Sequence, residues 1–198
     1  MANILTQALP EKVETENGAF ELETDFRASV EFEIMVENGE QDFCKLMKPY
    51  YPNGMPKQAA EAINAALWFY KCGEEKKEQT ENKPTRNTKQ AYSFSVDADV
   101  LYSDFLRYYN IDLTNAKLHW WKFRALLGGL PTESTFKERI YYRTCDLKGL
   151  SKAEKNRICE IRKHIEIKAE GQGEKITLEQ RNKQMLDYVA KRNSKTRG

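Results

Sequence analysis

The chain has 198 residues, with 32 Lys and Arg against 30 Asp and Glu and a formal net charge of +2. This length can bury a hydrophobic core, and a charge so close to balance argues against a dedicated nucleic-acid-binding protein. Residues 1–99 nevertheless carry 11 Lys and Arg and 18 Asp and Glu, a net −7, whereas residues 100–198 carry 21 and 12, a net +9. This asymmetry favours self-association or a partner with a charge bias; two solvated faces of opposite sign are the alternative.

The cysteines and the apolar segments narrow the class of protein further. The four cysteines form no Cys-x-x-Cys pair and have no histidines at zinc spacing, so we expect reduced side chains and no metal. No basic segment followed by an apolar run opens the chain, and no apolar stretch approaches the roughly 20 residues of a membrane span. We therefore expect an intracellular protein without a signal peptide and without a membrane segment.

The first predicted element is a short β-hairpin. Asn17-Gly18 is a dipeptide that suits a two-residue hairpin turn, and apolar residues alternate on both sides of it. Residues 25–37 then fit both the period of a helix and the alternation of a strand. Thr24 as an N-cap, with Asp25 in the first turn, favours a helix there.

Two further helices precede a charged segment. A short helix over 41–48 should end before Pro49, and a longer one should have Pro56 at its first position and end at Gly73. Residues 73–90 contain almost no apolar side chain, which predicts a solvated loop or a disordered linker. A helix from Ser95, as N-cap, to about Tyr109 follows. Its predicted core stripe comprises Leu101, Phe105 and Tyr108, thickened by Tyr102, Leu106 and Tyr109.

The next predicted helix, about 114–127, is apolar on two faces. At 100° per residue, Leu118, Trp121 and Ala125 share one face. Trp120, Phe123 and Leu127 share roughly the opposite face, and Lys122 and Arg124 lie in the seams between the two. Such a helix either passes through the core or offers its second stripe to another chain. The candidate partner-binding residues are Trp120, Trp121, Phe123, Leu127, Lys122 and Arg124.

Three more helices complete the chain. One is predicted over 133–144, and Ser151-Lys152-Ala153-Glu154 is a capping box that begins the next. After Gly171 and Gly173, a second capping box at 177–180 begins a basic amphipathic helix. The sequence therefore predicts a mainly α fold, an irregular helical bundle with a small N-terminal β-hairpin and a separate C-terminal helix. We expect a helical domain over 1–168, with a charged insert at 73–90, and a glycine linker with a basic tail over 169–198.

The sequence contains none of the common catalytic or nucleotide-binding motifs named below. No Gly-x-Ser-x-Gly, Walker or dinucleotide-binding loop occurs, and His119 and His164 are the only histidines. We expect no enzymatic activity, no catalytic residues and no cofactor. Nucleic-acid binding is an alternative, because the rings of 120–123 are interspersed with cations and basic residues continue along the back half. These basic residues include Lys137, Arg139, Arg143, Lys152, Lys155, Arg157, Arg162 and Lys163.

Several segments together resemble one family of phage proteins. The principal one is Leu118-His119-Trp120-Trp121-Lys122-Phe123 followed by Ala125-Leu126-Leu127-Gly128-Gly129-Leu130. Further segments are Leu9-Pro10, Glu23-Thr24-Asp25-Phe26-Arg27, Phe94-Ser95-Val96-Asp97, Phe105 to Leu113 and Ile140-Tyr141-Tyr142-Arg143. Over roughly residues 4–167 the chain is similar to the bacteriophage gene-product-fifteen family of tailed phages and prophages.

The resemblance implies a non-enzymatic role in tail morphogenesis. Genes of this family typically lie between those of the major tail protein and the tape measure protein, which is the position of tail assembly chaperones. We therefore expect a chaperone-like protein in the cytoplasm of the bacterial host. Its expected partners are the tape measure protein, further copies of itself and the major tail protein. A nucleic-acid-binding phage protein and a structural component of the finished tail are the alternatives.

Overall fold

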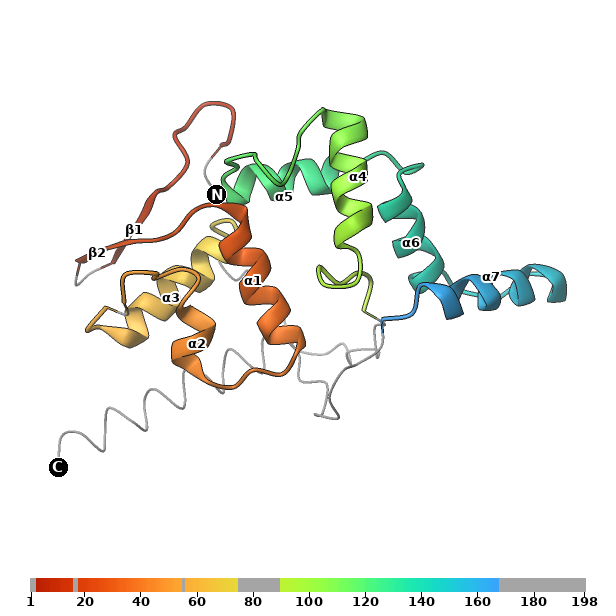
Figure 1. Cartoon of the computed structure of the whole chain (residues 1–198), viewed down its shortest axis with the longest axis horizontal. Coiled ribbons are helices and arrows are strands. Elements are labelled where there is room, and N and C mark those ends of the chain that lie inside the picture. The colour runs from red at the N-terminus through yellow and green to blue at the C-terminus, as the bar shows by residue number, and fades with distance from the viewer. Residues whose placement is uncertain (1–2, 16–17, 55, 75–89, 168–198) are drawn as a thin grey trace. The chain divides into compact units, whose positions relative to one another are not determined.

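The computed structural model describes residues 3–15, 18–54, 56–74 and 90–167. Its fold is mainly α, with a small antiparallel hairpin near the N-terminus, as the sequence predicts (Figure 1). The chain divides into two compact units, whereas the sequence predicts one helical domain over 1–168. The first unit contains the described residues up to Glu74 together with Leu118–Arg124, and the second contains the described residues 90–117 and 125–167. The predicted insert lies largely, and the C-terminal helix wholly, outside the described residues.

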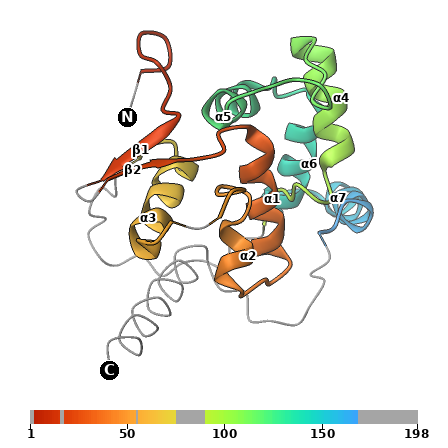
Figure 2. The same ribbon diagram turned by 60° about the vertical axis from the view of Figure 1, so that its left-hand side comes forward.

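The first unit combines the hairpin with three helices and the beginning of a fourth (Figure 2). Its elements are β1 (Lys12–Thr15), β2 (Gly18–Glu21), α1 (Phe26–Glu37), α2 (Phe43–Met47), α3 (Ala59–Tyr70) and the first turn of α5 (Trp120–Gly129). The second unit contains α4 (Ala98–Tyr109), the rest of α5, α6 (Thr135–Thr144) and α7 (Lys152–His164).

The hairpin has the predicted alternation. Val13 pairs with Phe20 across the two strands, and both side chains are buried. Because side chains alternate along a strand, Lys12 and Glu14, which flank Val13, are exposed. One face of the hairpin therefore contributes to the core of the first unit.

Side-chain caps decide where α1 and α2 begin. Asp25, and not the predicted Thr24, caps α1, because its carboxylate accepts a hydrogen bond from the Arg27 amide at 3.1 Å. The Thr24 carbonyl instead accepts a hydrogen bond from the Trp120 amide. Asp42 caps α2 in the same way as Asp25 caps α1.

Helix α5 begins six residues later than predicted. The carboxylate of Asp112 accepts hydrogen bonds from the amide and hydroxyl of Thr114 and from the side-chain amide of Asn115. Such local bonds compete with helix formation, so the chain turns there. Leu118 and Trp120 then form backbone hydrogen bonds to Phe26 and Thr24, and the helix starts only at Trp120.

The second unit also departs from prediction at α4. The Asp97 amide donates to the Ser93 carbonyl in a turn, and the helix begins at Ala98 rather than after Ser95. Val100, Leu101 and Phe105 are buried, whereas Tyr102 and Leu106 are exposed and do not thicken the core as predicted. In contrast, α7 begins at the predicted capping box, in which Ser151 and Glu154 each bind the other's backbone amide.

Candidate partner-binding surface

The two adjacent tryptophans of α5 are buried in the first unit. Trp120 is 0% and Trp121 is 5% exposed. Their indole Nε1 atoms donate hydrogen bonds of 2.8 Å to the carbonyls of Tyr70 and Phe69, respectively. The last carbonyls of a helix have no partner within it, so the two indoles satisfy the end of α3. Both tryptophans therefore stabilise the fold of the first unit.

The other predicted apolar site residues are also in the interior. Phe123 is 1% exposed, and its ring stacks on those of Phe26 and Trp120 with centroids 4.7 and 5.7 Å apart. Leu127 is 6% exposed. The structure thus brings Trp120, Trp121 and Phe123 together as core residues, and these buried faces offer no surface to another chain.

The two predicted cations of α5 are on the surface. Lys122 and Arg124 are both exposed, and the Arg124 guanidinium lies 5.6 Å from the centre of the Trp120 ring. A cation over an indole gains electrostatic attraction from the ring, so Arg124 also contributes to the local fold. The combination of accessible rings and cations that a nucleic-acid-binding surface requires is therefore not present on α5.

His119 connects this helix to the N-terminal segment. Its Nδ1 atom accepts a hydrogen bond from the Trp121 amide, and its Nε2 atom lies 3.1 Å from the Pro10 carbonyl. These contacts fit a neutral ring protonated at Nε2. Burial lowers the pKa of His119 below its ordinary value of 6.5; the charge of Lys122 lowers it further, while the Pro10 carbonyl and Glu11 oppose this shift.

An open apolar groove lies between β1 and α3 of the first unit. Its volume is about 430 Å³, and it is lined by residues 12–15 of β1 and by Asn64, Ala65 and Trp68 of α3. Figures 1 and 2 both show α3 beside the hairpin. A volume of this size lies within the range of about 300–1,000 Å³ of known ligand-binding pockets.

Trp68 is the site residue that the sequence analysis missed. It lies on α3, only half-buried, with its ring 5.5 Å from that of Trp121. In the amphipathic pattern of α3, Trp68 looks like a core residue. Only the packing of the hairpin shows that one side of its ring borders the groove. Partly exposed tryptophans are enriched at protein interfaces, because they combine a large apolar area with a polar N–H group.

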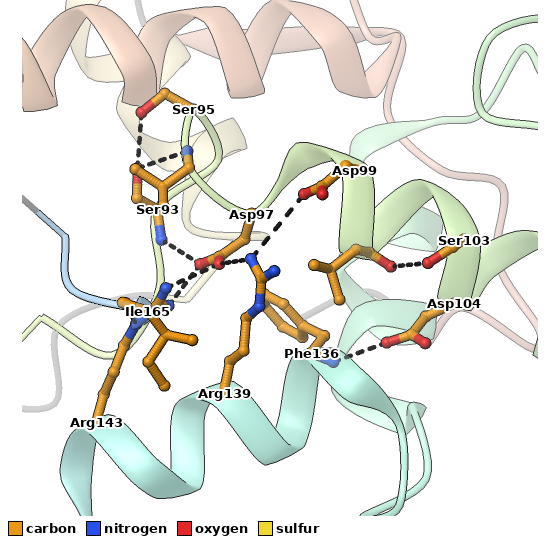
Figure 3. A network of polar contacts seen from close by, with 12 residues as sticks. Ser93, Ser95, Asp97, Asp99, Ser103, Asp104, Phe136, Arg139, Arg143 and Ile165 are labelled. Carbon is orange, nitrogen blue, oxygen red and sulfur yellow. Dashed lines mark hydrogen bonds and ion pairs between the residues drawn. The ribbon is translucent and has the colours of Figure 1, made fainter. Parts of the chain in front are cut away.

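A network of polar contacts holds the second unit together (Figure 3). Asp97 is 0% exposed and accepts hydrogen bonds from Arg143 at 2.6 and 2.9 Å, from Arg139 at 2.9 Å and from the Ser93 amide at 3.1 Å. Arg143 also donates to the carbonyl of Ile165 at 2.7 Å. The two guanidinium groups lower the pKa of Asp97 against the opposing effect of its burial.

Several arginines of the predicted basic surface are engaged in contacts within the second unit. Arg139 and Arg143 are engaged by Asp97, and Arg162 donates to the carbonyls of Tyr142 and Cys145 at the end of α6. Three of the arginines that suggested a phosphate-binding surface therefore have structural roles.

The comparison with known proteins identifies the family. The family model described as "Bacteriophage Gp15 protein" matches residues 5–167. The chain belongs to this family. It matches none of the curated proteins and none of the solved structures with which it was compared.

The structure explains what the principal segment of the Gp15-family resemblance does. The backbone of Leu118 and Trp120 binds the start of α1, while the indoles of Trp120 and Trp121 bind the end of α3. A segment that begins 48 residues beyond the end of α3 along the chain thus completes the core of the first unit. The fold of the first unit therefore depends on this segment.

Among the described residues, no three His, Cys, Asp or Glu side chains are grouped so that they could hold a metal ion. Among the helices of these same ranges, none combines the length and the apolar character needed to cross a membrane.

Proposed function

We propose that this phage protein is a non-enzymatic, chaperone-like factor of tail assembly that binds the tape measure protein and self-associates. The observation that carries the proposal is the groove between β1 and α3, with the half-buried Trp68 in its wall. Family membership supports a role in a phage. The gene position that the family resemblance implies supports a role beside the tape measure protein.

The groove has the properties that a client-binding protein needs. Its apolar surface comes mainly from the half-buried Trp68, whereas Val13 and Ala65 are largely buried beneath it, and charged side chains of both signs, Lys12 and Glu14, border it. Apolar client side chains can be shielded from water in such a groove while the charged rim stays hydrated.

A second apolar surface supports self-association. Tyr102 and Leu106 lie one turn apart on α4 and are 37% and 41% exposed. Residues four apart share one helix face, so the two side chains form an exposed apolar strip. The opposite net charges of the two halves of the sequence add attraction between copies.

Co-expression tests the proposed function. With the tape measure protein of the same phage, the full chain should keep that protein in the supernatant and co-purify with it. If the tape measure protein behaves identically with and without this chain, the proposal is refuted. Assay of purified virions separates the proposal from its structural alternative, because a chaperone-like factor leaves the finished tail and a tail component persists in it.

A pair of substitutions directs the test to the groove. Asn64 is exposed and lines the groove, so Asn64→Arg should fill it without removing a core contact, and co-purification should fall. Asn64→Ala is the matched control, because it opens the groove slightly and favours the helix. Equal co-purification by the two variants would exclude the groove as the client site.

A further inference from the structure

The groove follows the outer edge of β1. Lys12, Val13, Glu14 and Thr15 all line it, although consecutive side chains of a strand point to opposite faces. A cavity that touches all four residues must therefore run alongside the strand and meet its backbone. No residue of β2 lines the groove, so it lies on the side of β1 that β2 leaves uncovered.

The register of the hairpin shows which backbone groups face the groove. The Leu22 amide donates to the Glu11 carbonyl, and Glu11 would be the next partner of Leu22 in the register that pairs Lys12 with Glu21. Directly opposed residues of an antiparallel pair alternate between bonded and non-bonded positions, so Val13 and Thr15 bind β2. The amide and carbonyl groups of Lys12 and Glu14 then point outward, two residues apart.

The opposite wall of the groove suits alternate side chains of an added strand. The half-buried Trp68 of α3 supplies the apolar surface there, with the buried Ala65 and the exposed Asn64 beside it. The end of β1 is held in place, because the Thr15 hydroxyl is 3.0 Å from a carboxylate oxygen of Glu61 on α3. The edge and the wall are thus positioned before any ligand arrives, which reduces the entropic cost of binding.

We propose that an extended segment of the client adds to the hairpin as a third strand along β1, with apolar side chains at alternate positions directed at the wall formed by Trp68. Main-chain bonds to Lys12 and Glu14 recognise the extended backbone, and the groove selects the side chains, as in other cases of β-strand addition. An edge with outward amide and carbonyl groups matches an extended chain and not a helix, whose own backbone bonds are already formed. The inference rests on the proposed function and specifies the conformation of the bound client.

The occupant is therefore a peptide with an apolar residue at every second position, in contrast to the three- and four-residue spacing of a helical ligand. Lys12 and Glu14 carry opposite charges and the carboxylate of Glu61 lies at the end of β1, so the edge has no excess of positive charge. Binding should consequently depend little on salt, unlike the steep dependence of a phosphate-binding surface.

Proline substitutions on the two edges of the hairpin test the inference. Glu14→Pro removes an outward amide and obstructs the β1 edge, and proline is tolerated at such positions because β1–β2 bonding does not use them. Glu14→Ala removes the same carboxylate but keeps the amide. Glu21→Pro makes the same change on the outer edge of β2, since Glu21 opposes Lys12. Circular dichroism establishes that each variant is folded.

The probes are overlapping 15-residue peptides of the tape measure protein, labelled for fluorescence polarisation with the full chain. We expect the bound peptides to share the alternating pattern and Glu14→Pro to weaken binding about tenfold or more, because hydrogen bonds and access to the edge are lost together. Glu14→Ala and Glu21→Pro should bind as the native chain does. N-methylation of every second peptide amide should abolish binding when the methylated amides are those that face β1. Methylation of the other set of amides should leave binding intact.

Three results would overturn the inference. They are equal binding by Glu14→Pro and Glu14→Ala, bound peptides with helical spacing, and a Glu14→Pro variant that loses self-association while its peptide binding is unchanged. The last result would assign the edge to a second copy of this chain. If the native chain binds the tape measure protein and Glu14→Pro changes nothing, only the inference fails; if the native chain does not bind, the proposed function fails.

Discussion

Replacement of Asp97 by Asn should destabilise the second unit strongly. Asp97 is 0% exposed and accepts four hydrogen bonds, three of them from Arg139 and Arg143. Arg143 is 6% exposed, so loss of the carboxylate charge leaves a buried cation without its counter-ion. Removal of one member of a buried ion pair costs about 3–5 kcal/mol, a large part of the roughly 5–15 kcal/mol by which a domain is stable.

The neighbouring Asp99 provides the matched control. Its side chain is 80% exposed and lies 4.0 Å from Arg139, so Asp99→Asn removes the same charge beside the same arginine. Exposed ion pairs contribute about 0–1 kcal/mol, and the two variants should therefore differ by at least about 2 kcal/mol. A difference below about 1 kcal/mol would refute the reasoning that burial makes the Asp97 network essential.

Urea unfolding followed by far-UV circular dichroism measures these free energies. All three tryptophans of the chain, Trp68, Trp120 and Trp121, belong to the first unit, so their fluorescence reports on that unit alone. A parallel fluorescence measurement therefore shows whether the loss caused by Asp97→Asn is confined to the second unit. Double substitution with Arg143→Met should cost less than the sum of the single effects, because it removes the uncompensated cation.

Three further predictions concern the first unit and α7. The free energy of unfolding should fall as the pH is lowered from about 7 through the depressed pKa of His119, because the unfolded chain binds the proton more tightly than the buried ring. In His119→Gln this slope should flatten, and an unchanged slope in pH-dependent urea unfolding would contradict the assignment. Gly73→Ala should cost more than Gly39→Ala, because both positions have positive φ angles of 73° and 79° but only at Gly73 would the new Cβ lie 3.0 Å from Trp121; equal shifts of the urea midpoint would count against this crowding. Ser151→Ala should cost about 1 kcal/mol and reduce the hydrogen-exchange protection of the first turn of α7, and unaltered protection would show that the capping box does not stabilise the helix.

Local patterns predicted most elements of this fold to within a few residues. The alternation around Val13 and Phe20 predicted the hairpin, and the capping box at Ser151 predicted the start of α7. These features depend on residues that are close in sequence, so no knowledge of distant contacts is needed to predict them. The family resemblance rested on segments that include Trp120 and Trp121, and the match over residues 5–167 confirmed it.

Local patterns were insufficient where distant residues compete for the same groups. The sequence suggested Thr24 as the cap of α1 and a start of α5 near Thr114. In the structure, the Thr24 carbonyl and the amide of Trp120 bind each other across 96 residues, and both boundaries move. Likewise, the spacing of Tyr102 and Leu106 is that of a core stripe, yet both side chains are exposed because no element of the second unit covers that face among the described residues.

The candidate site shows most clearly the difference between what local patterns predict and what distant contacts decide. From sequence alone, Trp120, Trp121, Phe123 and Leu127 could be core or a partner-binding stripe, because burial and recognition both select large apolar side chains. The tertiary structure placed all four in the interior and exposed an apolar groove elsewhere, beside Trp68. The sequence determined that the helix containing Trp120 and Trp121 has more apolar faces than a surface helix needs. Only the packing of the hairpin against α3 decided which apolar surface stays exposed.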